Sequence, residues 1–142
     1  MTPEELARAC ADAMTAADNA SREAGIRLEA VGPGCATTAM RVLPSMANGH
    51  GICHGAYVFL VADTAFSYAC NTYGDVTVAA GCDIVFAAPA TAGDELVAEA
   101  VERARFGRNG IYDVTVRRTD GELIAEMRGR SRTTGDTILA SA

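Results

Sequence analysis

The sequence predicts an α+β fold in which one curved antiparallel β-sheet wraps around a single long central helix. Residues 54–73 carry apolar side chains on nearly every side of the helical wheel, as expected of a helix buried in a core. Strand-like segments precede and follow this stretch, in the order helix, two strands, helix, four strands. Strands and helices do not alternate one by one, which disfavours a parallel doubly wound sheet.

The N-terminal residues 1–25 predict the first helix. Thr2 suits the N-cap position, Pro3 suits the first turn, and Glu5 completes a capping box three residues after the cap. Apolar residues then recur at helical spacing as far as Ala20, and Gly25 is suited to end the helix.

Six stretches have the composition of strands, two before the central helix and four after it. They are residues 26–31, 35–43, 76–86, 95–106, 111–117 and 122–133. Gly32-Pro33-Gly34 predicts a turn between the first two, and Asp120-Gly121 predicts a tight turn between the last two. We expect all six strands to form one sheet.

Length and charge limit the classes of function. A chain of 142 residues has the size of one domain, and 49% apolar residues suffice for a core. The net charge of −6 argues against a nucleic-acid partner, which requires a positive field. All twelve basic residues are arginines, and eight of them lie in residues 101–142 beside six acidic residues. An anion site in the last third therefore remains open.

The cysteines, the histidines and the N-terminal residues indicate where the protein is located and whether it binds a metal. The five cysteines include no CxxC pair, so free thiols in a reducing compartment are expected rather than disulfides. The N-terminus lacks a signal peptide, and the longest apolar stretch, Ala56 to Ala62, is too short to cross a membrane. A cytoplasmic protein is expected. His50 and His54 lack a third ligand, so we expect no metal.

Asp63 is the most informative single residue, because it is a carboxylate within an apolar helix. Burying its charge costs several kcal/mol unless the group is paired or protonated. Ser67 and Asn71 follow at helical spacing and extend a narrow polar stripe. A catalytic carboxylate and a structural one, bonded to Ser67 or to an arginine, are about equally compatible with this pattern.

The start of the central helix supplies a second candidate group. The first N–H groups of a helix have no partner within it, and they carry the positive end of the helix dipole. At His54-Gly55 they are suited to hold a developing oxyanion, and the glycine lets a carbonyl approach closely. An ordinary helix start would explain the same residues.

The spacing of the two candidates predicts an oligomer. Asp63 follows Gly55 by eight residues, which is about 12 Å along a helix axis. One ester or thioester carbon cannot contact both groups of the same chain. Two antiparallel helices related by a twofold axis would bring Asp63 of one chain to Gly55 of the other.

The chain resembles the hot-dog fold thioesterases, and most closely their phenylacetate-degradation (PaaI-type) group. The matching segments are Asn48-Gly49-His50, His54-Gly55, Ala62-Asp63-Thr64-Ala65-Phe66, Tyr68-Ala69-Cys70-Asn71, Ala88-Pro89, Gly110-Ile111-Tyr112-Asp113 and Arg128-Gly129-Arg130-Ser131. The resemblance implies a hot-dog fold, usually a dimer of dimers. It also implies hydrolysis of acyl-coenzyme A thioesters without a metal or cofactor.

Site residues follow from the resemblance by position. Asp63 is similar to the family's catalytic carboxylate, which either attacks the thioester or activates water. Gly55 is similar to the oxyanion-hole residue, and His54 and Asn48 to residues that shape that end of the site. Ser67 is a candidate for orienting the water. Ala56 replaces a second glycine that is frequent in the family.

Arginines are the candidates for binding the phosphates of coenzyme A. Arg128, Arg130 and Arg132 alternate along one strand and so share one face of the sheet. A solvated face balanced by Glu126 is the alternative interpretation. Arg108 and Asn109, at a turn, form a second candidate group.

An acyl-CoA thioesterase for aromatic acyl groups, such as phenylacetyl or hydroxyphenylacetyl, is the favoured function. A non-catalytic acyl-CoA binding protein and a 3-hydroxyacyl thioester dehydratase, with His54 as its histidine, are the alternatives. Four rings on the central helix are candidates for an acyl pocket: Tyr57, Phe59, Phe66 and Tyr68.

Overall fold

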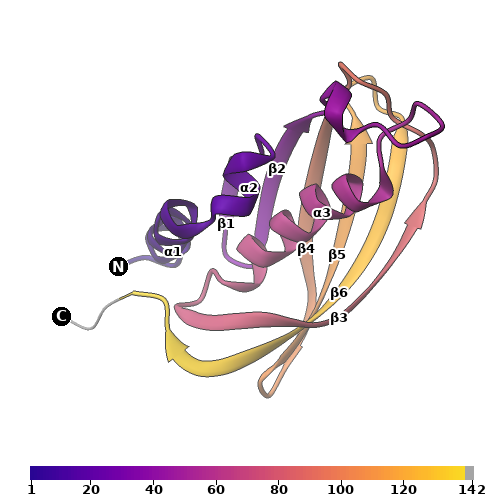
Figure 1. Ribbon diagram of the computed structural model, residues 1–142. Coiled ribbons are helices and arrows are strands. Elements are labelled where there is room, and N and C mark those ends of the chain that lie inside the picture. The colour runs from indigo at the N-terminus through magenta and orange to yellow at the C-terminus, as the bar shows by residue number, and fades with distance from the viewer. Residues whose placement is uncertain (140–142) are drawn as a thin grey trace.

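Six strands form one antiparallel sheet in the computed structural model, which describes residues 1–139. Their order in the sheet is β1-β2-β4-β5-β6-β3. The sheet curves around the long helix α3 (Gly55–Cys70), as Figure 1 shows. The predicted α+β hot-dog architecture is thus confirmed. The strand bounds are β1 Arg27–Gly32, β2 Cys35–Arg41, β3 Asp75–Phe86, β4 Glu95–Phe106, β5 Asn109–Arg118 and β6 Leu123–Thr137.

The N-terminal region differs from the single helix expected over residues 1–25. It forms two helices, α1 (Pro3–Ala17) and α2 (Asn19–Glu23), which are separated by Asp18. Asp18 leaves the helical conformation, and its side chain accepts a hydrogen bond from the Ser21 N–H at 3.0 Å. A second N-cap therefore interrupts the helix, whereas the predicted capping box of Thr2 and Glu5 is present.

The central helix is shorter than the expected residues 54–73. His54 is its N-cap, and Asn71 is its C-cap. The Asn71 side chain accepts a hydrogen bond from the Thr77 N–H at 2.8 Å and donates to the Thr77 carbonyl at 2.9 Å. Because these bonds draw the chain into β3, the helix ends before Asn71. A short 3₁₀ helix, η1 (Pro44–Met46), lies in the connection from β2 to α3.

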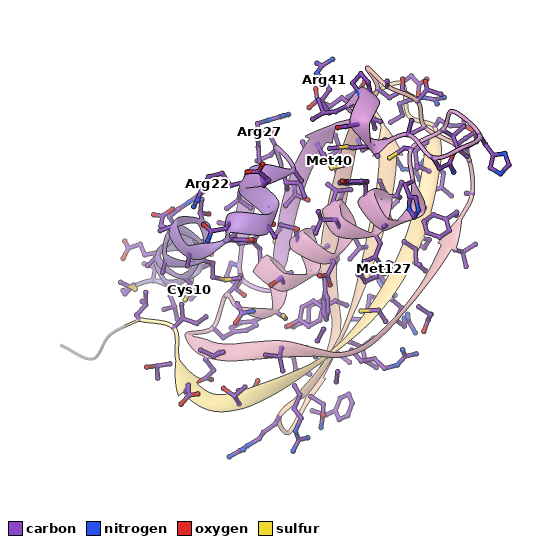
Figure 2. All side chains as sticks on the ribbon, in the orientation of Figure 1. Cys10, Arg22, Arg27, Met40, Arg41 and Met127 are labelled. Carbon is purple, nitrogen blue, oxygen red and sulfur yellow. The ribbon has the colours of Figure 1, made fainter. Side chains whose placement is uncertain are left out.

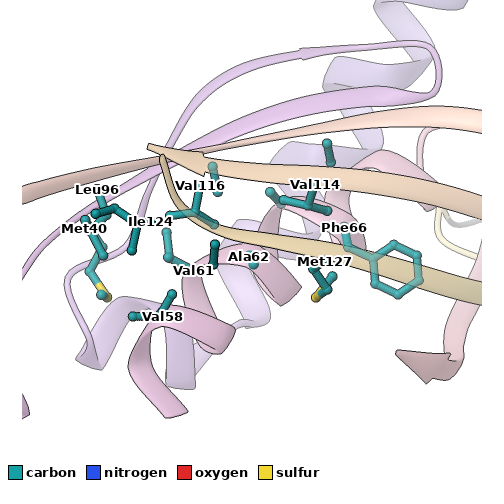
Figure 3. Close-up of a cluster of buried hydrophobic side chains, with 14 of the residues drawn as sticks. Met40, Val58, Val61, Ala62, Phe66, Leu96, Val114, Val116, Ile124 and Met127 are labelled. Atoms are coloured by element: carbon teal, nitrogen blue, oxygen red, sulfur yellow. The ribbon is translucent and has the colours of Figure 1, made fainter. Parts of the chain in front are cut away.

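The core lies between α3 and the concave face of the sheet (Figure 3). Both sides of this contact include buried alanines, which let the helix approach the strands closely; among them are Ala36, Ala62, Ala65, Ala69, Ala98 and Ala125. Met40 and Met127 point into the same layer, whereas Arg22, Arg27 and Arg41 lie on the outer surface (Figure 2).

One long edge of the sheet has no strand partner within residues 1–139. β3 pairs with β6 on one side only. Val78, Val85 and Phe86 of this strand are 48%, 69% and 52% exposed. Edge strands of this length with exposed apolar side chains are ready to pair with another chain. None of the described helices has the length and apolar character that a membrane crossing requires.

Candidate active site

The loop of residues 47–53 leads into α3 and is fixed by hydrogen bonds at both ends. Ala47 and Cys53 form an isolated β-bridge, and the His54 N–H donates to the Met46 carbonyl at 2.7 Å. Inside the loop, the Asn48 Oδ1 accepts the His50 N–H at 2.9 Å and the Ile52 N–H at 3.3 Å. Asn48 thus holds the shape of the loop next to the helix start.

The start of α3 presents one free backbone donor. The His54 Nδ1 accepts the Ala56 N–H at 3.1 Å, so the second amide of the helix is already capped. The Gly55 N–H finds no acceptor among the described residues. Because the helix dipole places partial positive charge here, this amide is suited to receive an oxyanion.

An apolar pocket of about 460 Å³ lies beside Gly55. Asn48, Ile52, Val58, Phe86 and Pro89 are among its lining residues. A Cβ atom placed on Gly55 would lie 3.0 Å from the Phe86 Cζ, closer than nine in ten real Cβ contacts. The glycine therefore allows the Phe86 ring to rest against the helix start.

Asp63 lies two turns further along α3 and is half-buried. Burial raises the pKa of its carboxyl, and the negative charge of Asp18 raises it further. No hydrogen bond or cation within residues 1–139 lowers it. The structural alternative, an Asp63 bonded to Ser67 or to an arginine of its own chain, is thus not found.

A chain of buried hydroxyl groups connects Asp18 to the residue beside Asp63. The Ser21 Oγ donates to the Asp18 Oδ2 at 2.6 Å, and it lies 3.0 Å from the Thr64 Oγ1. Thr64 in turn donates to the Leu60 carbonyl at 2.8 Å. These contacts hold the Asp18 carboxylate near α3. The sequence gives no signal for Asp18 at this site, because the contact joins segments that are far apart in the chain.

Asn71, the last residue of the polar stripe on α3, has a structural role. Asn71 joins the helix end to β3, and its Nδ2 also donates to the Ser67 carbonyl at 2.8 Å. The Ser67 hydroxyl forms no hydrogen bond with Asp63 in the described chain. The structure therefore gathers Asn48, His54 and Gly55 at one end of α3, with Asp63 and Ser67 further along it.

The predicted arginine stripe is partly neutralised by acidic residues. Arg128 binds both carboxylate oxygens of Asp113, at 2.7 and 2.9 Å, and Arg130 binds Asp83 at 2.9 Å. Arg128 lowers the pKa of the Asp113 carboxyl. These ion pairs favour the alternative interpretation, a solvent-exposed face whose arginine charges are balanced by acidic residues. The balancing residues are Asp113 and Asp83 rather than Glu126.

Arg132 and Arg108 form no ion pair within residues 1–139. Arg108 and Asn109 line a polar cavity of about 540 Å³ between the end of α3 and the turn from β4 to β5. Arg105 lies in the same wall, with its guanidinium 3.6 Å from the centre of the Tyr73 ring. The described residues hold no group of three His, Cys, Asp or Glu side chains arranged for a metal.

Two of the four rings considered for the acyl pocket belong to the core instead. Phe66 is 1% exposed and packs on Tyr112, with ring centres 5.6 Å apart. The Tyr68 hydroxyl lies 2.7 Å from the Thr15 hydroxyl and so joins α3 to α1. The aromatic ring beside Gly55 is instead that of Phe86. The sequence shows only that Phe86 ends a predicted strand, which does not indicate a place at the site.

The family model of the thioesterase superfamily matches residues 50–125, which include the end of the loop, the helix start and Asp63. This chain belongs to the thioesterase superfamily. Among curated superfamily proteins, the acyl-coenzyme A thioesterase PaaI of Escherichia coli is 39% identical over 132 residues, which cover 93% of this chain and 94% of that protein.

Solved structures of the superfamily agree with this assignment. The PaaI protein from the phenylacetic acid degradation operon of E. coli superposes with a TM-score of 0.94 at 38% identity, covering 96% of this chain and 99% of the other. A mutant of the phenylacetic acid degradation protein PaaI from Thermus thermophilus gives a TM-score of 0.79 at 32% identity, covering 82% of this chain and 100% of the other.

Proposed function

We propose that this protein hydrolyses acyl-coenzyme A thioesters, with arylacetyl groups such as phenylacetyl or hydroxyphenylacetyl as its preferred acyl part. The observation that carries the proposal is an unpaired, half-buried Asp63 on the same helix as the free Gly55 N–H. The name of the E. coli relative, an acyl-coenzyme A thioesterase, supports the reaction type. The names of the two solved relatives link them to phenylacetic acid degradation.

Gly55 is proposed to stabilise the transition state. When a nucleophile attacks the thioester carbon, the carbonyl oxygen becomes an oxyanion that accepts the Gly55 N–H. His54 directs this amide by capping Ala56, and Asn48 fixes the adjoining loop. Removing one such donor in other enzymes costs about 10²–10³ in kcat.

Asp63 is proposed to be the base or the nucleophile. As a base it takes a proton from water, whose oxygen attacks the thioester carbon; the tetrahedral intermediate then collapses and expels the thiolate of coenzyme A. As a nucleophile its carboxylate oxygen attacks the thioester carbon, expels the thiolate of coenzyme A and forms a mixed anhydride, which water hydrolyses in a second step to the free acid and the regenerated carboxylate. Ser67 is a candidate for orienting the water. A single turnover in ¹⁸O-labelled water separates the two mechanisms, because only the nucleophile takes label into its own carboxylate.

A homo-oligomer, at least a dimer and by the resemblance a dimer of dimers, is part of the proposal. Gly55 and Asp63 are about 12 Å apart along α3, so a second copy must complete each site. The unpaired edge of β3 offers a surface on which two chains can join. The five free thiols fit a cytoplasmic location.

The phosphates of coenzyme A are proposed to contact the arginine-rich last third of the chain. Arg108 and Asn109, in the wall of the polar cavity, are the first candidates, together with the unpaired Arg132. Arg128 and Arg130 would have to exchange Asp113 and Asp83 for phosphate.

The first test is the release of free coenzyme A from a panel of acyl-CoA thioesters. Asp63→Asn should lower kcat/KM by about 10²–10⁴, the usual contribution of a general base. Asp12→Asn, at an exposed position of α1, is the matched control and should leave turnover unchanged. Full turnover by Asp63→Asn would contradict the assigned role.

Two other outcomes of the panel would replace the proposed function. Loss of water from a 3-hydroxyacyl thioester without release of thiol would identify a dehydratase. Tight binding of the thioesters without any turnover would identify an acyl-CoA binding protein.

A further inference from the structure

Phe86 places a half-exposed aromatic ring beside the start of α3. It is the last residue of β3 and is 52% exposed, yet its ring tip rests against the first residue of α3. A ring kept at the candidate oxyanion site has a position suited to contact with substrate.

The surroundings of the ring favour an apolar ligand. The pocket that Phe86 lines is walled by Ile52, Val58 and Pro89 together with three alanines, and among the described residues Phe86 is the one aromatic side chain in its lining. Its volume of about 460 Å³ exceeds what a six-membered ring requires. Within residues 1–139, its lining includes no charged side chain.

We infer that Phe86 is a specificity-determining residue that holds the aryl ring of the acyl group against its own ring. This inference rests on the proposed function. With the thioester carbonyl at the Gly55 N–H, an arylacetyl group places its ring one methylene away from the carbonyl carbon. Because Phe86 touches Gly55, that ring lies within reach of Phe86, whereas a flexible alkyl chain gains no ring-to-ring contact.

The test compares phenylacetyl-CoA with hexanoyl-CoA, which carries an alkyl group of similar size. Phe86→Leu should lower kcat/KM for phenylacetyl-CoA about tenfold, and the value for hexanoyl-CoA by less than about threefold. Phe86→Tyr, which keeps the ring, should retain the wild-type ratio. Val101→Ala is the matched control, because Val101 is a half-exposed apolar side chain on β4 that does not line the pocket.

A binding measurement makes the result independent of turnover. In an Asp63→Asn background, the affinity for intact phenylacetyl-CoA should fall about tenfold when Phe86→Leu is added. If Phe86→Leu lowered kcat/KM equally for phenylacetyl-CoA and hexanoyl-CoA, and the affinity for the two thioesters equally, the inference would be overturned. Phe86 would then be a residue that only supports Gly55. Selective binding without hydrolysis by the wild type would overturn the proposed function and retain the inference.

Discussion

Asp63 is a carboxylate whose surroundings favour its protonated form. Burial raises its pKa first, and the charge of Asp18 adds to the effect. A base of raised pKa is more effective at accepting a proton but is ionised only at higher pH. A partly buried carboxylate whose pKa is raised further by a second carboxylate is typical of a functional site rather than of a structural ion pair.

Asp18→Asn should therefore move the acid limb of the pH profile. Removing the negative charge of Asp18 lowers the pKa of Asp63, so Asp63 is ionised, and kcat/KM rises, at lower pH than in the wild type. Asparagine still caps α2, so the helix should remain. The pH dependence of kcat/KM for phenylacetyl-CoA is the measurement. Asp12→Asn removes an exposed charge and should leave the limb in place, and an unmoved limb in Asp18→Asn would refute the coupling.

At the scale of elements, the contact between α3 and β6 depends on a single glycine. A Cβ atom placed on Gly129 would lie 2.8 Å from three atoms of the Phe66 ring. Phe66 is 1% exposed and packs against Tyr112 of β5, so the ring has little room to move. The distance between helix and sheet is thus set by Gly129 on one side and by alanines on the other.

Gly129→Ala should destabilise the fold by about 1–3 kcal/mol, the usual cost of overpacking a core. Urea unfolding at fixed protein concentration measures the change. Gly49→Ala is the control, because an added Cβ there meets nothing within 4 Å and the backbone needs no left-handed conformation. A wild-type midpoint for Gly129→Ala would show that the ring and the strand can separate freely.

The elements were predictable where their signals are local. The capping box at Thr2, the turns and the apolar helix around Asp63 are each encoded within a few residues. The N-cap at Asp18 was not, because helical spacing of apolar residues continues past it. The place of Phe86 beside Gly55, and of Asp18 near Asp63, depends on contacts between distant segments. Periodicity and composition carry no signal for such contacts.

At the scale of the whole molecule, the proposed active site requires groups from two chains. Gly55 and Asp63 are held apart by two turns of a continuous helix, and no change of side-chain rotamer can join them. The free edge of β3 has exposed Val78 and Val85 along the same side of the sheet. A paired second chain would cover these side chains and bring in the missing group.

Mixing two inactive variants tests this arrangement directly. Gly55→Pro removes the N–H donor, and proline is tolerated at the first position of a helix. Asp63→Asn removes the base. In a dimer of either variant alone, every shared site lacks one of the two groups. In a dimer of one Gly55→Pro chain and one Asp63→Asn chain, one site lacks both groups and the other site has both. An equal mixture, unfolded and refolded together so that chains pair at random, should regain about a quarter of wild-type coenzyme A release.

The same mixture without unfolding is the control, since chains that have not exchanged should stay inactive. Sedimentation of the refolded mixture shows whether its assembly matches that of the wild type. If each site lay within one chain, the mixture would stay inactive even after exchange, because every chain would keep its own defect. Recovery near a quarter therefore requires that Gly55 and Asp63 of different chains act on one thioester, as their separation along α3 demands.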